Sequence, residues 1–468
     1  MALGRQKERQ ADLMIGWAEL PCSPGHPFYD RLQGVLVEAG FDDFAEAQCK
    51  PFYAAKQGRP SVPPGRYFRL HLVGYFEGID SERGLEWRCA DSLSLREFLR
   101  LGMTERVPDH SWLSKTRSRL PLEIHEAVFT WVLQRLAAHG LIKGDRIGID
   151  ASTMEANAAL RTIVRRDTGE GYRAMLERLA AESGIATPTA DDLVRLDRKR
   201  KGKRLANAEW ASPSDPEAKI AKLKDGRTHL AYKPEHAVDL DTATIAAAEV
   251  HPADRGDTAT LPETLQAAEA HLAAVDRAPQ PEDPAELVAD KSLPRARSGG
   301  YHSRDGLKEL EDGAWKSRIA EKKVAGVSRW HGDEAAQRAV YNNRARLRSE
   351  VAKEAFKLRA ELVERSFALT LDRGGMRRAW LRGRENIHKR YLIHVAGYNL
   401  GLIMRLLVGT GTPREFMAGI SAHLMLFATA ATSVVGILIV AAGAEAATLV
   451  ITVEPEPHGS RPTSSTRC

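Results

Sequence analysis

The chain contains only four cysteines, and they are not spaced as metal ligands. No two of them form a CxxC pair, and only Cys22 has a nearby histidine, His26, with no second pair of ligands to complete a site. We therefore expect no zinc centre, because a structural zinc needs four such ligands. The simplest interpretation of so few cysteines is a reduced, cytoplasmic chain.

The sequence also shows no internal repeat and no secretory signal. Near the amino terminus, the apolar stretch at residues 13–18 is too short for the core of such a signal. One long uncharged run covers residues 424–444, and its length would allow a membrane span. Because this run is rich in Ala, Thr, Ser and Gly, we expect a buried or read-through tail and no membrane partner. A membrane anchor is the alternative that its length leaves open.

The sequence does contain enough apolar residues for a large core, together with a mild excess of positive charge. Of its 468 residues, 43% are hydrophobic and 28% are charged, and the formal net charge is +6. This length and composition predict a folded chain of about two to three domains. We expect a flexible amino terminus, a helical domain, an α/β domain with a polar, basic insertion at about residues 157–228, and a tail of uncertain structure; these segments are residues 1–24, 25–140, 141–410 and 411–468.

Helical patterns dominate the predicted helical domain. Residues 94–102 and 108–120 are expected to form two helices around a Gly-containing turn, and the second helix carries Lys115, Arg117 and Arg119. This is the outline of a helix-turn-helix motif, in which the second helix enters the major groove of DNA. An ordinary helical hairpin would give the same outline, so DNA binding by these helices is a hypothesis.

Short apolar stretches that end in aspartate predict strands after residue 140. One such stretch ends at Asp150, and a second of the same design ends at Asp290. Between them, residues 229–239 and 244–251 predict a β-hairpin, and residues 261–275 predict an amphipathic helix. The succession of strand, hairpin, helix and strand indicates an α/β fold with a mixed sheet.

Two segments are strongly basic. Residues 197–204 carry six cations in eight positions, and residues 338–390 carry 15 Lys and Arg against 6 Asp and Glu. Each such cation can neutralise one phosphate of a nucleic acid, although a solvated loop also explains the first segment. Much of the first half of the second segment is expected to be helical, from about residue 335 to residue 369.

Three carboxylates could together bind divalent cations. Asp150 and Asp290 each end a predicted strand, and Glu364 lies on the predicted basic helix. Two hard cations about 4 Å apart need carboxylate oxygens that converge from different elements. Such a centre could cut a phosphodiester, with one ion activating the attacking oxygen and the other stabilising the leaving oxygen. Taken alone, Asp150 could equally be a capping group for the next turn.

Short phrases around these residues occur in a characteristic order along the chain. They are Gly58-Arg59-Pro60-Ser61, Gly74-Tyr75-Phe76, Leu93-Ser94-Leu95-Arg96, Pro108-Asp109-His110-Ser111, Ile149-Asp150-Ala151-Ser152, Tyr232-Lys233, Ala237-Val238-Asp239, Val288-Ala289-Asp290-Lys291, Val363-Glu364-Arg365-Ser366-Phe367, Leu381-Arg382-Gly383 and Tyr398-Asn399-Leu400. This ordered set resembles the bacterial insertion-sequence transposases of the DDE type. The resemblance covers roughly residues 25–415.

The resemblance implies an α/β fold with a ribonuclease-H-like mixed sheet flanked by helices, preceded by an all-α DNA-binding domain. It implies that Asp150, Asp290 and Glu364 are the catalytic residues and that they bind two Mg²⁺ ions, with Mn²⁺ as a substitute. The implied enzyme is a transposase that cleaves the ends of an insertion element and joins them to target DNA. Its partners would be double-stranded DNA, as terminal inverted repeats and as target, and a second copy of the chain in a homodimer. The residues implied to contact DNA are Lys115, Arg117, Arg119, Lys233, Arg377, Arg378, Arg382, Arg384, Lys389 and Arg390.

The sequence departs from the family pattern in two places. Where many relatives have Gly-Tyr directly after the second aspartate and its lysine, residues 292–299 intervene here before Gly300 and Tyr301. Around the glutamate, many relatives have an Arg four residues before and a Lys seven residues after, whereas this chain has Ala360 and Leu371 there. Glu361, about one helical turn before Glu364, therefore competes with it as the third ligand. A metal-dependent nuclease without strand transfer, or a DNA-binding product that has lost its chemistry, would fit the same residues.

Overall fold

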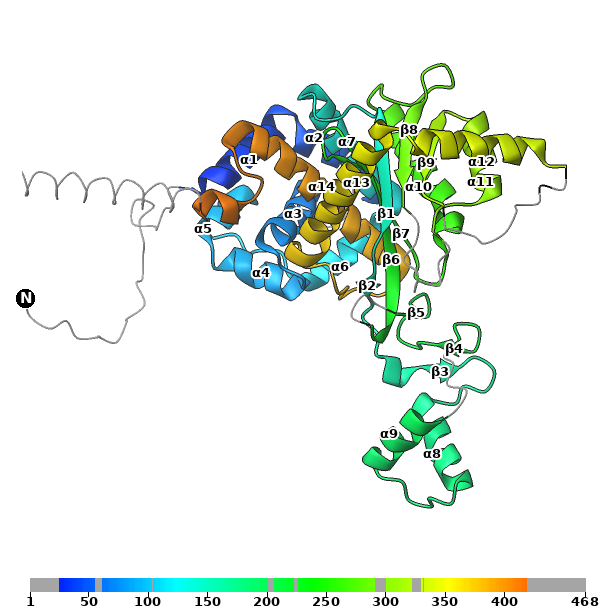
Figure 1. Cartoon of the computed structure of the whole chain (residues 1–468). Coiled ribbons are helices and arrows are strands. Elements are labelled where there is room, and N and C mark those ends of the chain that lie inside the picture. Colours follow the sequence, from blue (N-terminus) through cyan, green and yellow to red (C-terminus); the bar gives the residue numbers. More distant parts are fainter. Residues whose placement is uncertain are drawn as a thin grey trace, which may run out of the picture. The chain divides into compact units, whose positions relative to one another are not determined.

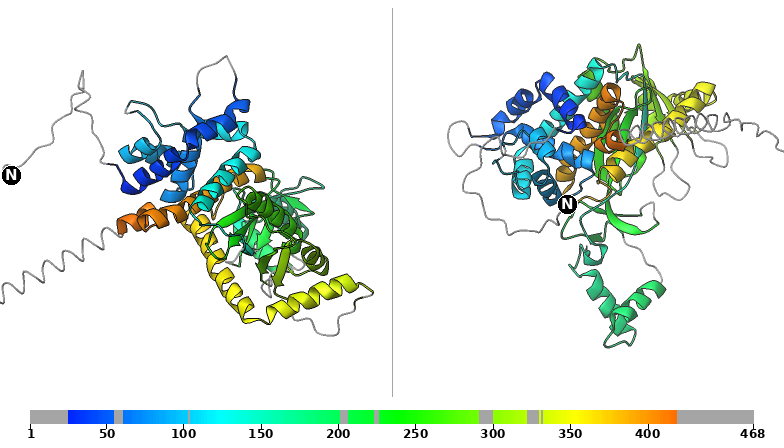
Figure 2. Two further views of the ribbon diagram at one scale, coloured as in Figure 1. Left: turned by 90° about the horizontal axis from the view of Figure 1, so that it is seen from above. Right: turned by 90° about the vertical axis from the view of Figure 1, so that its left-hand side faces the viewer.

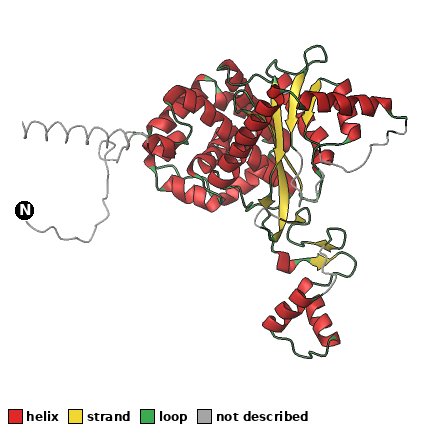
Figure 3. Ribbon diagram, viewed as in Figure 1, coloured by secondary structure: helices red, strands yellow, loops and turns green. Residues whose placement is uncertain are grey.

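The structure is a computed structural model of the chain. It describes residues 25–54, 61–102, 104–200, 206–222, 226–290, 300–321, 330 and 332–418. The chain divides into two compact units, residues 1–413 and 414–468, and the helices and strands named below belong to the first. This unit is a mixed α/β structure (Figures 1 and 3).

All regular structure in the described residues up to 140 is helical. Polar caps fix where several of these helices begin; for example, the side chain of Asp109 accepts a hydrogen bond of 2.7 Å from the backbone N–H of Trp112. The helices of this segment are α1 (Pro27–Glu38), α2 (Phe41–Cys49), α3 (Pro64–Glu77), α4 (Glu82–Ala90), α5 (Leu93–Phe98), α6 (His110–Arg119) and α7 (Leu122–Ala138), with a 3₁₀ turn at Lys50–Phe52.

The two helices expected at residues 94–120 are present as α5 and α6. Residues 99–109 separate them, whereas a helix-turn-helix motif joins its helices by a turn of about three to four residues. The connection is therefore longer than the motif requires. This difference favours the ordinary helical hairpin over the DNA-binding motif for this pair.

Seven strands form one mixed sheet: β1 (Arg146–Ala151), β2 (Met154–Glu155), β5 (Lys219–Lys222), β6 (Thr228–Asp239), β7 (Ile245–Pro252), β8 (Ala285–Ala289) and β9 (Trp315–Ile319). Ala237 of β6 pairs with Ile149 of β1 and with Ala247 of β7, so β6 lies between these strands and is antiparallel to both. On the other side of β1, first β8 and then β9 run parallel to it. The order across the sheet is therefore β7, β6, β1, β8, β9, which confirms the expected mixed sheet.

The helices after residue 140 are α8 (Tyr172–Glu182), α9 (Ala190–Lys199), α10 (Asp257–Ala273), α11 (Arg304–Asp312), α12 (Glu334–Leu347), α13 (Glu350–Phe367) and α14 (Arg384–Val408), with a 3₁₀ turn at Leu160–Thr162 and a π-helical turn at Ala368–Arg373. The first two lie within the segment expected to be a polar insertion. There α8 packs against α9, and the short strands β3 (Val164–Arg165) and β4 (Trp210–Ala211) form a separate two-stranded sheet. The predicted insertion thus contains regular structure of its own.

Helices cover both faces of the central strand β6. Glu235 accepts a hydrogen bond of 2.5 Å from Thr264 of α10, and the next residue, His236, lies 2.8 Å from the hydroxyl of Ser366 on α13. Successive side chains of a strand point to opposite faces of the sheet. Helices α10 and α13 therefore lie on opposite faces. As a result, all of β6 after its first two residues is buried.

The basic segment expected to be helical at about residues 335–369 is helical and divides into two helices. Helix α12 ends at Leu347, and Ser349 begins α13 by accepting a hydrogen bond of 3.2 Å from the backbone N–H of Ala352. A serine in this position satisfies an N–H group that the start of a helix leaves unpaired. The two helices, both yellow, meet at an angle in Figure 2.

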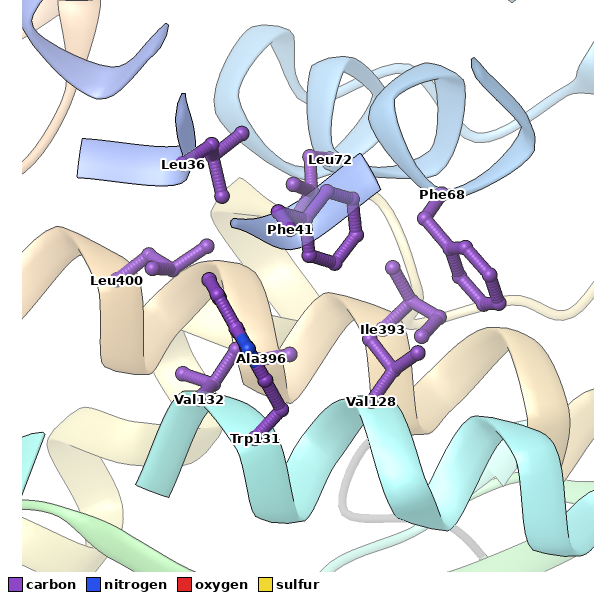
Figure 4. Close-up of a pocket in the computed structure, with 10 residues that line it drawn as sticks. All are labelled: Leu36, Phe41, Phe68, Leu72, Val128, Trp131, Val132, Ile393, Ala396 and Leu400. Atoms are coloured by element: carbon purple, nitrogen blue, oxygen red, sulfur yellow. The ribbon is translucent and has the colours of Figure 1, made fainter. Parts of the chain in front are cut away.

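Helix α14 joins the amino-terminal helices to the sheet. It packs against α3 and α7 and also against β7, and Figure 2 (left) shows it in orange between the blue and cyan helices and the green sheet. Ten apolar side chains fill part of this contact, as Figure 4 shows: Leu36, Phe41, Phe68, Leu72, Val128, Trp131, Val132, Ile393, Ala396 and Leu400. The cavity that remains among them measures about 10 Å³. This core is therefore filled and has no room for a ligand.

By length and composition alone, the helical stretch at residues 384–418 could cross a membrane. However, 67% of its apolar window is buried within the protein, as in the core helix of a folded domain. The apolar run at residues 424–444, which raised the question of a membrane anchor, lies outside the described residues.

We expect the substitution Gly397→Ala to lower the free energy of unfolding by about 1–3 kcal/mol. A Cβ at Gly397 of α14 would lie 2.6 Å from Cδ1 and 2.9 Å from Cγ of Tyr75. Tyr75 is only 6% exposed, so its ring cannot move aside without disturbing the core. The matched control is Gly34→Ala on α1, where the nearest atom to a new Cβ is 3.8 Å away. This control should be neutral or stabilising by up to about 1 kcal/mol. Equilibrium unfolding in urea measures both variants, and equal effects would contradict this account.

Candidate active site

The pairing of β1 with β8 brings Asp150 and Asp290 together. The two strands are parallel, and Ile149 of β1 pairs with Ala289, the last residue of β8. Because Asp150 and Asp290 directly follow these partners, both carboxylates lie at the same edge of the sheet on neighbouring strands. Their side chains are 31% and 47% exposed, respectively. The structure therefore brings two of the three predicted site residues together.

A single guanidinium group contacts both carboxylates. Arg359 of α13 places Nη2 2.9 Å from Oδ2 of Asp150 and Nη1 3.8 Å from Oδ2 of Asp290. Its Nε and Nη2 atoms also donate to the backbone oxygen of Ile149, at 3.2 and 3.1 Å. The side chain of Arg359 is only 7% exposed. A buried positive charge therefore lies against both carboxylates at this edge of the sheet.

The third predicted ligand, Glu364, is on the same helix as Arg359 but does not complete a cluster. Helix α13 packs on the sheet with Val363 and other buried side chains, whereas Glu364 is exposed. The competing residue Glu361 is also exposed and forms an ion pair with Arg365. Within the described part of the chain, no three or more His, Cys, Asp or Glu side chains gather closely enough to hold a metal ion.

The two aspartates have the donor chemistry that a hard divalent cation requires. Mg²⁺ and Mn²⁺ bind carboxylate oxygens and keep several of their waters, so one or two carboxylates can hold an ion together with substrate phosphates. Asp150 and Asp290 therefore fit one such cation at the position that now attracts the guanidinium. A second ion needs a further ligand, which Glu364 as placed does not supply.

A buried polar network lies beside this edge and was missed by sequence reasoning. Glu235 of β6 pairs with Ala151 of β1 and is completely buried. Its oxygens accept hydrogen bonds from the hydroxyls of Tyr301, at 2.6 Å, and Thr264, at 2.5 Å, and Nζ of Lys233 is 3.6 Å away. Glu235 gave no signal in the sequence, because one acidic residue in a predicted strand is more simply explained as solvent-exposed.

The pKa values in this network follow from burial and from the neighbouring groups. Burial alone would raise the pKa of Glu235, but the hydrogen bond with His251 and the charge of Lys233 hold it below its ordinary value. Burial, together with the negative charges of Glu235 and Asp150, raises the pKa of Tyr301 well above its ordinary value. At neutral pH Glu235 is therefore ionised and Tyr301 keeps its proton, which matches a hydrogen bond donated by the tyrosine.

A second buried network links α13 to the strand that pairs with Asp150. His236 lies opposite Asp150 in the register of β6 and β1. One ring nitrogen is 2.8 Å from the hydroxyl of Ser366, the other is 2.6 Å from the hydroxyl of Tyr391, and the ring stacks on Phe367 with centroids 4.1 Å apart. Burial lowers the pKa of His236 to about 3, so the ring is neutral at physiological pH. His236 therefore acts as a structural link that sets the position of α13.

Four of the ten cations predicted to contact DNA are buried. Three of them form ion pairs, Arg117 with Glu82, Lys233 with Asp257 at 2.7 Å and Lys389 with Glu385 at 2.6 Å. Arg390 donates a hydrogen bond of 3.1 Å to the backbone oxygen of Ile79. This burial counts against direct contact of these residues with DNA. They are Arg117, Lys233, Lys389 and Arg390, which are 5%, 6%, 4% and 1% exposed.

Several of the remaining predicted cations lie close to the aspartate edge. We call residues 376–384 the basic loop. The backbone N–H of Glu155 donates a hydrogen bond of 2.9 Å to the backbone oxygen of Arg377 in this loop. Glu155 belongs to β2, which is separated from the end of β1 by two residues. Arg378 and Arg382 of this loop are exposed, and residue 378 lies beside Glu155. The basic loop therefore presents positive charge to solvent beside β2.

The amino-terminal helices match a known family model. Residues 22–119 match the model described as "Transposase domain (DUF772)". The matched residues include helices α1 to α6 but not the sheet that carries Asp150 and Asp290. No curated protein and no solved structure matches this chain. The match to a transposase domain supports a transposase role for this chain, and such a role implies binding to DNA.

Proposed function

We propose that this protein is a DNA transposase of the DDE type, which cleaves the ends of an insertion element with water and then joins the freed 3′-hydroxyl groups to target DNA. One observation carries the proposal: Asp150 and Asp290 meet at the ends of parallel strands in a chain whose residues 22–119 match a transposase domain. The strand order β7, β6, β1, β8, β9, in which only β6 is antiparallel to its neighbours, supports a ribonuclease-H-like catalytic part.

The carboxylates are proposed to hold the cations, and the basic loop is proposed to hold the DNA. Asp150 and Asp290 would bind Mg²⁺ or Mn²⁺, and Glu364 is proposed as a ligand of a second ion because it extends from the helix that already contacts both aspartates through Arg359. Such ions activate the attacking oxygen and stabilise the leaving oxygen of a phosphodiester. The exposed cations of the basic loop would neutralise backbone phosphates and so place a phosphodiester at the aspartate edge.

The partners proposed for this chain are double-stranded DNA and a second copy of itself. The DNA would be the terminal inverted repeats of the element and the target into which they are joined. The surface proposed to contact it comprises the predicted cations that are at least partly exposed, which are Lys115, Arg119, Arg377, Arg378, Arg382 and Arg384. A homodimer would hold the two ends of one element together.

A strand-transfer assay tests this function. The purified full-length protein is incubated with labelled duplexes that carry the terminal inverted repeats flanking its coding region, a supercoiled target plasmid and Mg²⁺ or Mn²⁺. We expect labelled ends to become covalently joined to the plasmid. Cleavage without joining would indicate a metal-dependent nuclease instead, and binding without cleavage would indicate an inactive element product. Duplexes of the same length with shuffled ends provide the control for sequence specificity.

We expect the double substitution Arg378→Ala and Arg382→Ala to weaken DNA binding by removing two phosphate contacts. A plot of the logarithm of the DNA-binding constant against the logarithm of salt concentration has a negative slope. Each lost phosphate contact should reduce the magnitude of that slope by about 0.9. The matched control is Lys316→Ala, which removes an exposed cation from β9. Fluorescence anisotropy on a labelled duplex at several salt concentrations measures the slopes. If the control lowers the slope as much as the double variant does, the basic loop is not the DNA surface.

A further inference from the structure

Arg359 spans the ends of two strands with one planar group. Through Nε and Nη2 it donates to the backbone oxygen of Ile149, through Nη2 it contacts Asp150, and through Nη1 it approaches Asp290. Both terminal nitrogens of the guanidinium thus have a carboxylate beside them, and the side chain is buried. It compensates the repulsion that two carboxylates on adjacent strands would otherwise exert on each other.

A divalent cation would need the same carboxylate oxygens. Oδ1 of Asp150 already accepts a hydrogen bond of 2.8 Å from the backbone N–H of Ala151, and Oδ2 is the oxygen that faces Arg359. On Asp290, Oδ2 is likewise the oxygen nearest the guanidinium. A metal ion that bridges the two Oδ2 atoms would therefore lie next to a positive charge, and two cations at one pair of oxygens repel each other.

We propose that Arg359 is a resident counter-cation of the Asp150–Asp290 pair and that a divalent cation must displace its guanidinium to bind both carboxylates. This inference rests on the proposed metal-dependent function of the same aspartates. Arg359 keeps the pair neutralised and the strand ends in place while no metal is bound. The same contacts lower the affinity for metal, because binding has to break them.

The test measures Mn²⁺ binding without measuring catalysis. Free Mn²⁺ is followed by electron paramagnetic resonance during titration of the full-length protein at pH 7.5. We expect Arg359→Gln to bind Mn²⁺ at least about tenfold more tightly than the unaltered protein, since the amide cannot compensate two carboxylates. Lys357→Gln is the matched control, because it removes the same charge from an exposed position on the same helix. It should leave the affinity unchanged.

Two further variants keep the outcome decisive. Arg359→Lys retains the charge and the buried aliphatic part of the side chain but loses the planar guanidinium that contacts both carboxylates. Its Mn²⁺ affinity should therefore fall between those of the unaltered protein and Arg359→Gln. If the glutamine variant does not fold, the lysine variant alone decides, and an affinity equal to or below that of the unaltered protein overturns the inference.

Asp150→Asn tests the site itself. Loss of Mn²⁺ binding in Asp150→Asn, with no gain in either Arg359 variant, rejects only the role of Arg359. If Asp150→Asn leaves the Mn²⁺ affinity unchanged, both alone and combined with either Arg359 variant, the proposed metal function is rejected as well.

Discussion

The substitution Asp150→Asn should reduce Mg²⁺-dependent cleavage of end-containing DNA at least about 10³-fold, equivalent to about 4 kcal/mol of transition-state stabilisation. The amide keeps the size of the carboxylate but cannot contribute the negative charge that holds a divalent cation. DNA affinity should remain almost unchanged, because phosphate contacts come from Lys and Arg. Gel assays of cleavage, with binding measured separately by anisotropy in EDTA, separate the two effects.

The neighbouring aspartate and a remote carboxylate provide the comparison. Asp290→Asn should give a loss of similar size, since the two residues end paired strands and share one counter-charge. Glu350→Gln, at the exposed start of α13, should leave cleavage unchanged. Cleavage by Asp150→Asn at the rate of the unaltered protein would refute the assignment of this carboxylate to the active site.

The substitution Glu235→Ala should lower the free energy of unfolding by about 3–5 kcal/mol, the usual cost of removing one partner from a buried ion pair. Glu235 is completely buried, and its loss leaves the hydroxyls of Tyr301 and Thr264 without this acceptor and removes one of the two carboxylates beside Lys233. Glu282→Ala removes an exposed carboxylate and should change stability by no more than about 0.5 kcal/mol. Urea unfolding at pH 7 measures both.

The same residue gives a pH dependence with a defined sign. The pKa of Glu235 is lower in the folded protein than its ordinary value, so its ionised form stabilises the fold. That contribution is fully present above the unfolded pKa of about 4.3 and is lost as the pH falls through the folded pKa. The stability difference between the unaltered protein and Glu235→Gln should therefore stay constant from pH 7 to about 4.3 and shrink only as the pH is lowered further. A difference that grows on acidification would show that the carboxylate is not ionised in the fold.

The strands and the position of both aspartates could be predicted from the sequence because their signals are local. An apolar run that ends in a carboxylate shows where a strand stops, and two runs of the same design indicate two strand ends. Their meeting depends on the parallel register of β1 and β8, which is a contact between segments far apart in the chain. The sequence supported this meeting only through the family resemblance. The role of Arg359 depends on the same register and carried no local signal.

The local sequence could not show which of the basic side chains are buried. Lys233 stands in an alternating strand, and alternation normally places one face of a strand in solvent. In this fold α10 and α13 cover opposite faces of β6, so the lysine is enclosed whichever way it points. Lys389 and Arg390 are enclosed for a related reason: α14 is surrounded by helices and by the sheet, so it has little face left for solvent. In both cases the burial comes from an element that is covered on more than one side.

The position of α14 also restricts how this protein can change in evolution. Its side chains fill part of the core of the amino-terminal helices and pack on β7 as well, so the two parts share buried apolar surface through this helix. A recombination event that exchanged residues 25–140 between two transposases would join surfaces that have not been selected to fit. Under the proposed function, new recognition of element ends is therefore expected to arise by substitutions in exposed loops and side chains, and not by exchange of residues 25–140 as a separate module.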